Sequence, residues 1–389
     1  MQPESPGPEA SEPVSRPGIP RATTILLALG GATVAAFGIA AIRGIFTPVF
    51  MALVITICLH PIRRWMQRHG VPRGIATGTT IAAGFAVLGC LSVVLIAALA
   101  QFSALLPQYA PQLDQLGASI AQLLESVGFG SEQTQTVLQA FTPGRLIGFI
   151  TDLLGNITGM VGVLVIILTM LILMAVDGGR VAALLTHLQF YRPAMGAAFS
   201  GFATDIRRYT VATTILGAAQ GLFNWLVLFI LQVPGAMAWG VLSFICSFIP
   251  NIGYFIAIIP PLVFGALSGG WPVVLAVILT YGVINGVIQS IIQPKYIGNA
   301  VSLSETLTFV SVLFWAAVLG AVGAILAVPL TLLVRTILLD SDPSKIWRRA
   351  LTGDKKDIES ALKLEDDAIR ARRARRRSDR PHPDGTRKK

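Results

Sequence analysis

Two apolar stretches in the C-terminal half of this chain are too long for one membrane crossing, and glycine interrupts each near its middle. The first runs from Gly235 to Leu267 and breaks at Pro250–Gly253, and the second runs from Thr306 to Leu339 and breaks at Gly320–Gly323. Each is about 33 residues long, whereas about 20 apolar residues cross a bilayer once. Interrupted helices at matching positions of two repeats are typical of transport sites inside membranes.

The composition supports a membrane protein. The 389 residues are 53% hydrophobic and 13% charged, with a mean hydropathy of +0.69, whereas soluble domains carry about 25% charged residues. The net charge of +10 gathers at the ends of apolar runs and in the C-terminal tail, as in the positive-inside pattern. The sequence therefore predicts an all-α polytopic integral membrane protein, and we expect no nucleic-acid partner.

About six full spans are expected besides the two broken stretches. They are 23–41, 46–59, 74–100, 157–176, 210–231 and 273–292. The short link Ile42–Ile45 predicts a tight hairpin between the first two. Arginines in the loops after the second and fourth spans place those loops, and both termini, in the cytoplasm of a bacterial inner-membrane protein.

The broken stretches have two interpretations. Two half-helices of about 15 residues would each be about 22 Å long, which is less than the ~30 Å hydrocarbon core. This favours re-entrant hairpins over two short crossings, which would give eight or more crossings in total. Each hairpin with its preceding span forms a repeat, Thr210–Leu267 and Val273–Leu339. The repeats would have inverted topology, with the first hairpin entering from outside and the second from inside.

The chain divides into five predicted regions. They are a disordered segment at 1–22, N-terminal spans at 23–100, an extracytoplasmic segment at 101–151, a transport core at 152–339 and a basic cytoplasmic tail at 340–389. Apolar residues from Phe102 to Leu123 follow a heptad spacing. They predict a helix that contacts another subunit or caps the bundle, or one that lies on the membrane surface or on its own spans.

The candidate site combines the two breaks with amides in the neighbouring spans. Proline and glycine leave backbone groups that protein, water or solute must satisfy, and interhelical hydrogen bonding is the alternative role for the amides. A plain turn is the alternative for the first break. The candidate path residues are Pro250, Asn251, Gly253, Asn285, Gln289, Gly320, Gly323 and Asn224.

The sequence carries no recognisable motif for catalysis or for cofactor binding. The sequence holds no nucleotide-binding P-loop and no zinc-protease motif, and its four histidines are scattered. Neither repeat carries a carboxylate within its apolar part, which counts against proton exchange. We therefore expect no enzyme activity, metal or cofactor, and a small polar solute as the cargo.

The segment Ser247–Pro261 resembles a signature of the AI-2E family, the PerM-like permeases. Gln293–Gly298, Gly320–Pro329, Asp177–Arg180 and the pair Arg208-Tyr209 resemble further parts of it. The resemblance implies an inner-membrane exporter of autoinducer-2, a quorum-sensing molecule. It also implies an elevator-like motion and a homo-oligomer, with a pentamer as one arrangement, embedded in membrane lipid.

These features predict an exporter of a small polar solute that works by alternating access. The alternatives are a sodium/proton antiporter, which the resemblance also allows, and a membrane assembly protein that transports nothing.

Overall fold

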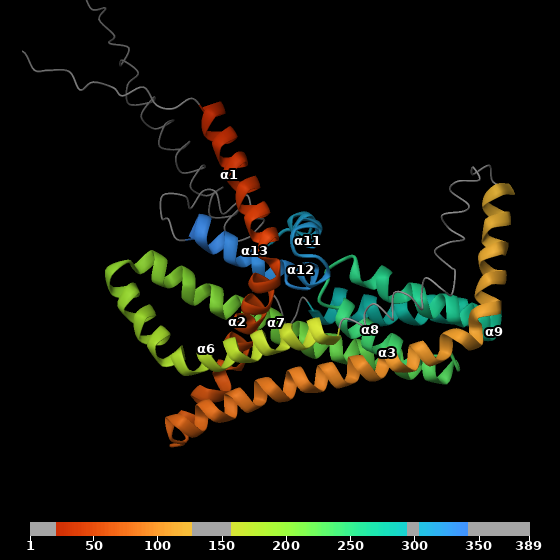
Figure 1. The fold of residues 1–389 in the computed structure, drawn as a ribbon, viewed down its shortest axis with the longest axis horizontal. Coiled ribbons are helices and arrows are strands. Elements are labelled where there is room, and N and C mark those ends of the chain that lie inside the picture. Colours follow the sequence, from red (N-terminus) through yellow and green to blue (C-terminus); the bar gives the residue numbers. More distant parts are fainter. Residues whose placement is uncertain (1–20, 127–156, 294–302, 341–389) are drawn as a thin grey trace, which may run out of the picture.

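The structure, a computed structural model, describes residues 21–126, 157–293 and 303–340. Every regular element in these ranges is a helix. Figure 1 shows their arrangement. The N-terminal helices are α1 (Arg21–Ala41), α2 (Arg43–Arg68), α3 (Arg73–Ser126) and α6 (Ile157–Tyr191). The remainder are α7 (Pro193–Ile230), α8 (Ala236–Cys246), α9 (Gly253–Gly286), the π-helix η1 (Val287–Ile292), α11 (Glu305–Leu319), α12 (Ala321–Ile325), α13 (Ala327–Arg335) and the π-helix η3 (Thr336–Asp340).

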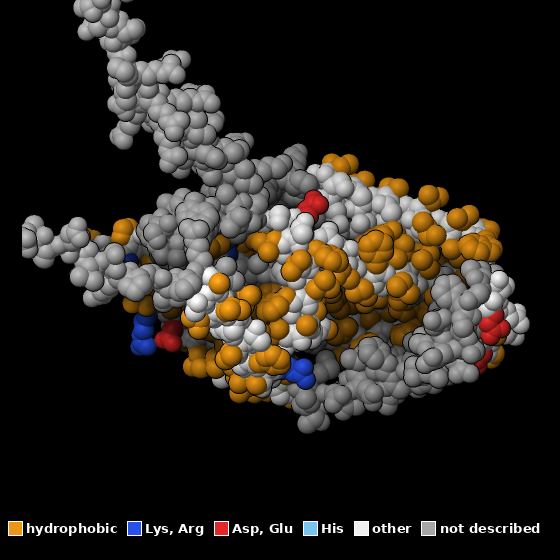
Figure 2. Space-filling model, turned by 90° about the horizontal axis from the view of Figure 1, so that it is seen from above, with side chains coloured by type: hydrophobic (Ala, Val, Ile, Leu, Met, Phe, Trp, Pro, Cys, Tyr) orange, Lys and Arg blue, Asp and Glu red, His pale blue; other side chains and the backbone are white. Residues whose placement is uncertain are grey.

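The expected all-α membrane fold is confirmed, with five described helices that are long and apolar enough to cross a membrane. By length and composition they are Arg43–Arg68, Arg73–Leu105, Val161–Tyr191, Pro193–Ile230 and Gly253–Ile292, the last of which folds back at Gly270. The first expected span, 23–41, is not among them, because its apolar part is shorter. Apolar side chains spread over the described surface in Figure 2, as lipid-facing helices require.

The tight hairpin expected between the first two spans is wrong. Only Ile42 separates α1 from α2, and helical hydrogen bonds continue across it, from Ile42 N to Gly38 O (3.3 Å) and from Phe46 N to Ile42 O (2.9 Å). Ile42 departs from helical geometry, with a φ of −102° and a ψ of 17°, but helical hydrogen bonds on both sides of this single residue leave no room for a reversal of the chain. The chain therefore keeps its direction from α1 into α2 (Figure 1).

The segment from Asp177 to Tyr209 is helical rather than the expected loop. α6 continues to Tyr191 and α7 starts at Pro193, so a single residue joins two long helices at one end of the molecule (Figure 1). Charged residues do not end a helix, and Pro193 is well placed at a helix start because its missing N–H has no intrahelical partner there.

α3 joins the third span to the first part of the heptad segment in one helix of 54 residues. Pro107 and Pro111 lie inside it, and its last part turns away from the long axis of the rest (Figure 1), because proline removes a helical hydrogen bond. The rings of Phe102 and Tyr109 lie 5.8 and 5.7 Å from that of Phe264. This packing supports the interpretation that the segment rests on the chain's own spans, and residues 127–156 lie outside the described ranges.

α9 folds back on itself at Gly270, whose φ of 64° and ψ of −157° are not helical. A Cβ at Gly282 would lie 3.9 Å from the hydroxyl of Tyr254, although the two residues would be about 42 Å apart in a straight helix. Residues 253–269 and 271–286 are therefore two antiparallel arms. The second arm continues into η1 and corresponds to the expected span at 273–292.

Candidate functional site

The first break forms a tight turn between α8 and α9. The turn is held by hydrogen bonds from Ile252 N to Pro250 O (2.7 Å) and from Gly253 N to Ile249 O (3.0 Å). Asn251 has a φ of 64°, a left-handed conformation that asparagine tolerates better than most residues. Its side chain is exposed, so it is available to a solute as well as suited to the turn.

Gly253 closes this turn against the first arm. A Cβ at this position would lie 1.9 Å from the carbonyl oxygen of Cys246, so no larger residue fits without moving backbone. The second turn closes in the same way, since a Cβ at Gly323 would lie 2.1 Å from the carbonyl oxygen of Trp315. In each hairpin a glycine in the returning arm therefore packs directly on a carbonyl of the first arm.

The second turn begins at Gly320, with a φ of 76° and a ψ of −157°. These angles are essentially restricted to glycine. Polar contacts then tie the two arms of this hairpin. Trp315 Nε1 donates to Thr331 Oγ1 (3.1 Å), and the hydroxyl of Ser311 contacts Thr331 and donates to Ala327 O (3.3 Å).

Both turns contribute to one hydrophobic cluster. Ile249 and Ile252, on either side of the Pro250-Asn251 pair, pack against it. The cluster contains Leu319 and Ala324, which flank Gly320 and Gly323. Two turns that lie 70 residues apart in sequence, marked by Gly253 and Gly323, thus share one hydrophobic cluster.

The candidate amides come from α7 and from the second arm of α9. Gln220 Nε2 donates to Asn285 Oδ1 across a distance of 3.4 Å, which is an interhelical hydrogen bond of the kind expected for buried amides in spans. Asn224, one turn further along α7, is 1% exposed. Gln289 lies in η1, and single π-helical turns frequently mark functional sites.

Two further polar residues join this region that sequence reasoning did not single out. Ser243 of α8 and Tyr281 of α9 are buried, and their hydroxyls lie 3.4 Å apart. The signal for them was a polar residue inside an otherwise apolar run, and it was weak because Ser and Tyr are common in such runs.

A groove of about 670 Å³ lies between α3, α7 and α8, but it does not suit a polar solute. Apolar side chains such as Val87, Leu91 and Met237 line it, together with Gly221 and Gly240. Since a polar solute needs hydrogen-bonding partners to replace water, the region around the turns and amides is the better candidate.

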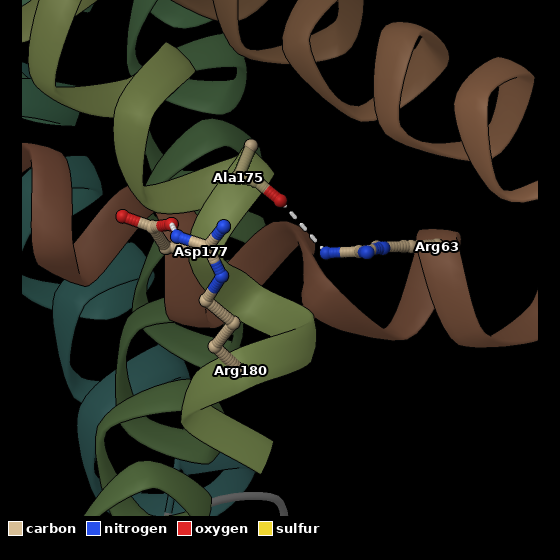
Figure 3. Close-up of polar contacts among 4 residues, drawn as sticks. All are labelled: Arg63, Ala175, Asp177 and Arg180. Carbon is tan, nitrogen blue, oxygen red and sulfur yellow. Dashed lines mark hydrogen bonds and ion pairs between the residues drawn. The ribbon is translucent and has the colours of Figure 1, made fainter. Parts of the chain in front are cut away.

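An arginine joins α2 to α6 by donating to a backbone carbonyl. Arg63 Nη1 of α2 donates to Ala175 O of α6 at 2.7 Å (Figure 3). The adjacent Gly178 leaves room for this guanidinium, since a Cβ there would lie 2.8 Å from Arg63 Nη1. Asp177 and Arg180 form an exposed ion pair at 3.1 Å.

The family model described as "AI-2E family transporter" matches residues 24–341. The chain belongs to the AI-2E transporter family. The AI-2 transport protein TqsA of Escherichia coli (strain K12) is 30% identical over 315 residues, covering 81% of this chain and 91% of the relative. The putative transport protein YhhT of the same organism is 27% identical over 336 residues, covering 85% and 92%.

A putative transport protein of Haemophilus influenzae is 27% identical over 338 residues, covering 86% of this chain and 97% of the relative. The resemblance to the AI-2E family inferred from sequence is therefore confirmed. Membership makes this chain a multi-pass bacterial membrane protein of a transporter family, and the family match includes all eight candidate path residues.

Proposed function

We propose that this AI-2E family member exports a small polar solute, autoinducer-2 or a chemically similar molecule, across the bacterial inner membrane. It works by alternating access with an elevator-like motion. The observation that carries the proposal is that both hairpin turns contribute to one hydrophobic cluster: Ile249 and Ile252 of the first turn pack against the cluster that contains Leu319 of the second. Paired interrupted helices at mid-membrane are the usual site of secondary transporters.

The directions of the helices support inverted hairpins. In Figure 1 the α2–α3 and α6–α7 connections lie at one end, where α13 also finishes, and the α7–α8 connection lies toward the other. The first connections carry arginines such as Arg68, Arg73 and Arg192, so this end is the cytoplasmic one in the proposal. The first hairpin then opens outward and the second opens to the cytoplasm, with both termini inside.

The lack of charge along the path supports a neutral cargo. From Ala236 to Ile292 the sequence has no Asp, Glu, Lys, Arg or His. A site that exchanges protons normally needs an ionisable side chain inside the membrane, so the antiporter alternative has no group of this kind in the first hairpin. The homo-oligomer and its lipid surroundings remain part of the proposal through the family resemblance.

Uptake of labelled autoinducer-2 by everted membrane vesicles tests the function. Vesicles that contain the protein should accumulate the molecule, because inward movement in everted vesicles corresponds to export. Equal accumulation in vesicles without the protein would show that the proposed function is wrong.

The role of the first turn is tested by Asn251→Gly and Asn251→Leu. Glycine keeps the positive φ of 64° and removes only the side chain, whereas leucine also strains the turn. If the amide binds solute, Asn251→Gly should lower transport about tenfold, because a lost hydrogen bond to substrate is worth about 1–1.5 kcal/mol. Full activity of Asn251→Gly with reduced activity of Asn251→Leu would instead assign Asn251 to the backbone turn alone.

A further inference from the structure

One buried amide in the described part of the chain lacks the partners that such a group requires. Asn224 is 1% exposed, and neither its Oδ1 nor its Nδ2 has a hydrogen-bond partner among the described residues. Buried polar groups are almost always hydrogen-bonded, and an unmade hydrogen bond within a membrane destabilises the fold. A hydrophobic residue would be the stabilising choice at this position unless the amide binds something else.

The register of the helices places other polar groups at the same level. α7 and the second arm of α9 run in opposite directions (Figure 1), and Gln220 pairs with Asn285. Asn224, one turn after Gln220, is therefore level with Tyr281, one turn before Asn285. Tyr281 in turn contacts Ser243, so the three helices α7, α8 and α9 each supply polar groups to one region.

The chemistry of these groups defines a ligand class. The residues that supply them carry two donor–acceptor hydroxyls and three amides, and no formal charge. They are Gln220, Asn224, Ser243, Tyr281 and Asn285. An asparagine amide offers two N–H donors on Nδ2 and an acceptor on Oδ1, and these two atoms lie about 2.3 Å apart. A ligand that satisfies both at once must present an acceptor and a donor on adjacent atoms, as a vicinal diol or an α-hydroxy ketone does.

We propose that these five residues form a solute-binding site within the bundle, for an uncharged solute with adjacent hydroxyl or carbonyl oxygens, and that Asn224 determines its specificity. The inference deepens the proposed transport function and rests on it. The site is separate from the exposed side chain of Asn251 at the first turn, and the Gln220–Asn285 bond orients the amides beside it.

Thiol accessibility tests the site without depending on the identity of the cargo. Asn224→Cys is made in a chain whose Cys58, Cys90 and Cys246 are replaced by alanine. We expect it to react with neutral methyl methanethiosulfonate much faster than with the anionic sulfonatoethyl reagent. Leu228→Cys is the matched control, because Leu228 lies one turn further along α7 and is equally buried in an apolar cluster. It should react with neither reagent.

Transport provides the second measurement. Asn224→Leu should remain folded and raise the KM for autoinducer-2 about tenfold or more, because the ligand loses two hydrogen bonds. Unchanged transport by folded Asn224→Leu would overturn the proposal. It would also be overturned if Asn224→Cys reacted no faster than Leu228→Cys. If wild-type vesicles fail to move autoinducer-2 while Asn224→Cys reacts selectively, the choice of cargo is wrong and the site stands.

Discussion

At the residue scale, glycine is required in these hairpins for two separate reasons. Gly253 and Gly323 are required by contact, since each lies against a carbonyl oxygen of the opposite arm. Gly320 and Gly270 are required by conformation, with φ values of 76° and 64°. The pattern of glycines in the sequence predicted where the breaks lie. It could not predict which glycine provides contact and which provides backbone freedom, because that depends on the arm opposite.

Gly323→Ala should weaken the second hairpin. The added methyl group would lie 2.1 Å from the backbone oxygen of Trp315, so the arms must separate, at a cost of about 1–3 kcal/mol for overpacking. Gly89→Ala is the control, because Gly89 lies inside α3 with nothing within 4 Å of its added Cβ. Thermal unfolding in detergent should show a lower melting temperature for Gly323→Ala only. Equal melting temperatures of the two variants would show that the close approach of Gly323 to Trp315 does not limit the residue at this position.

The amides show the same limit of sequence reasoning at this scale. The four-residue spacings of Gln220 with Asn224, and of Asn285 with Gln289, could be recognised in the sequence. The pairing of Gln220 with Asn285 and the proximity of Ser243 to Tyr281 could not, because each depends on how two distant helices are aligned along their axes.

At the element scale, α2 is joined to α6 and α7 by arginines that bind backbone carbonyls rather than carboxylates. Pro61 has no N–H, so the helical partner of the Ile57 carbonyl is missing. Arg207 of α7 supplies the replacement, with Nε donating to Ile57 O at 3.2 Å. Arg63 makes the equivalent contact to Ala175 of α6. A proline inside α2 thus creates the acceptor that attaches the helix to its neighbour.

Arg207→Met should therefore destabilise the packing of α2 on α7 by about 1.5–3 kcal/mol, the range for hydrogen bonds to charged groups. Methionine keeps much of the apolar stem and removes the donor. Arg208→Met changes the next, exposed position and should have little effect. The measurement is the apparent melting temperature of each purified variant, and a similar fall in both would attribute the effect to net charge instead.

At the scale of the whole molecule, the sequence predicted the long helices well but predicted poorly where one helix ends and the next begins. Hydropathy and charge predicted the long helices α2, α3, α6 and α7 and the break positions, because these properties are local. The continuation of α1 into α2 and of α6 past Asp177 was missed. Helix continuity depends on tertiary support, for example the contact of Arg63 with Ala175, and a charged or glycine-containing segment alone does not end a helix.

The orientation of the two hairpins is a property of the whole molecule, and labelling from each side of the membrane tests it. Ser268→Cys lies beside the fold-back of α9 at Gly270, and Glu305→Cys lies at the start of α11; both positions are exposed. In a chain without its three native cysteines, an impermeant anionic thiol reagent should label Ser268→Cys in right-side-out vesicles and Glu305→Cys in everted vesicles.

Labelling of Asn251→Cys in the same experiment reports how deep the first turn lies in the membrane. If the first stretch is a re-entrant hairpin, this exposed position lies within the thickness of the membrane and should react slowly with the impermeant reagent in everted vesicles. Rapid cytoplasmic labelling would mean that α8 and the first arm of α9 cross the membrane completely. Labelling of Ser268→Cys and Glu305→Cys from the same side would instead rule out the inverted relation, and alternating access between two opposed hairpins would then lose its structural basis.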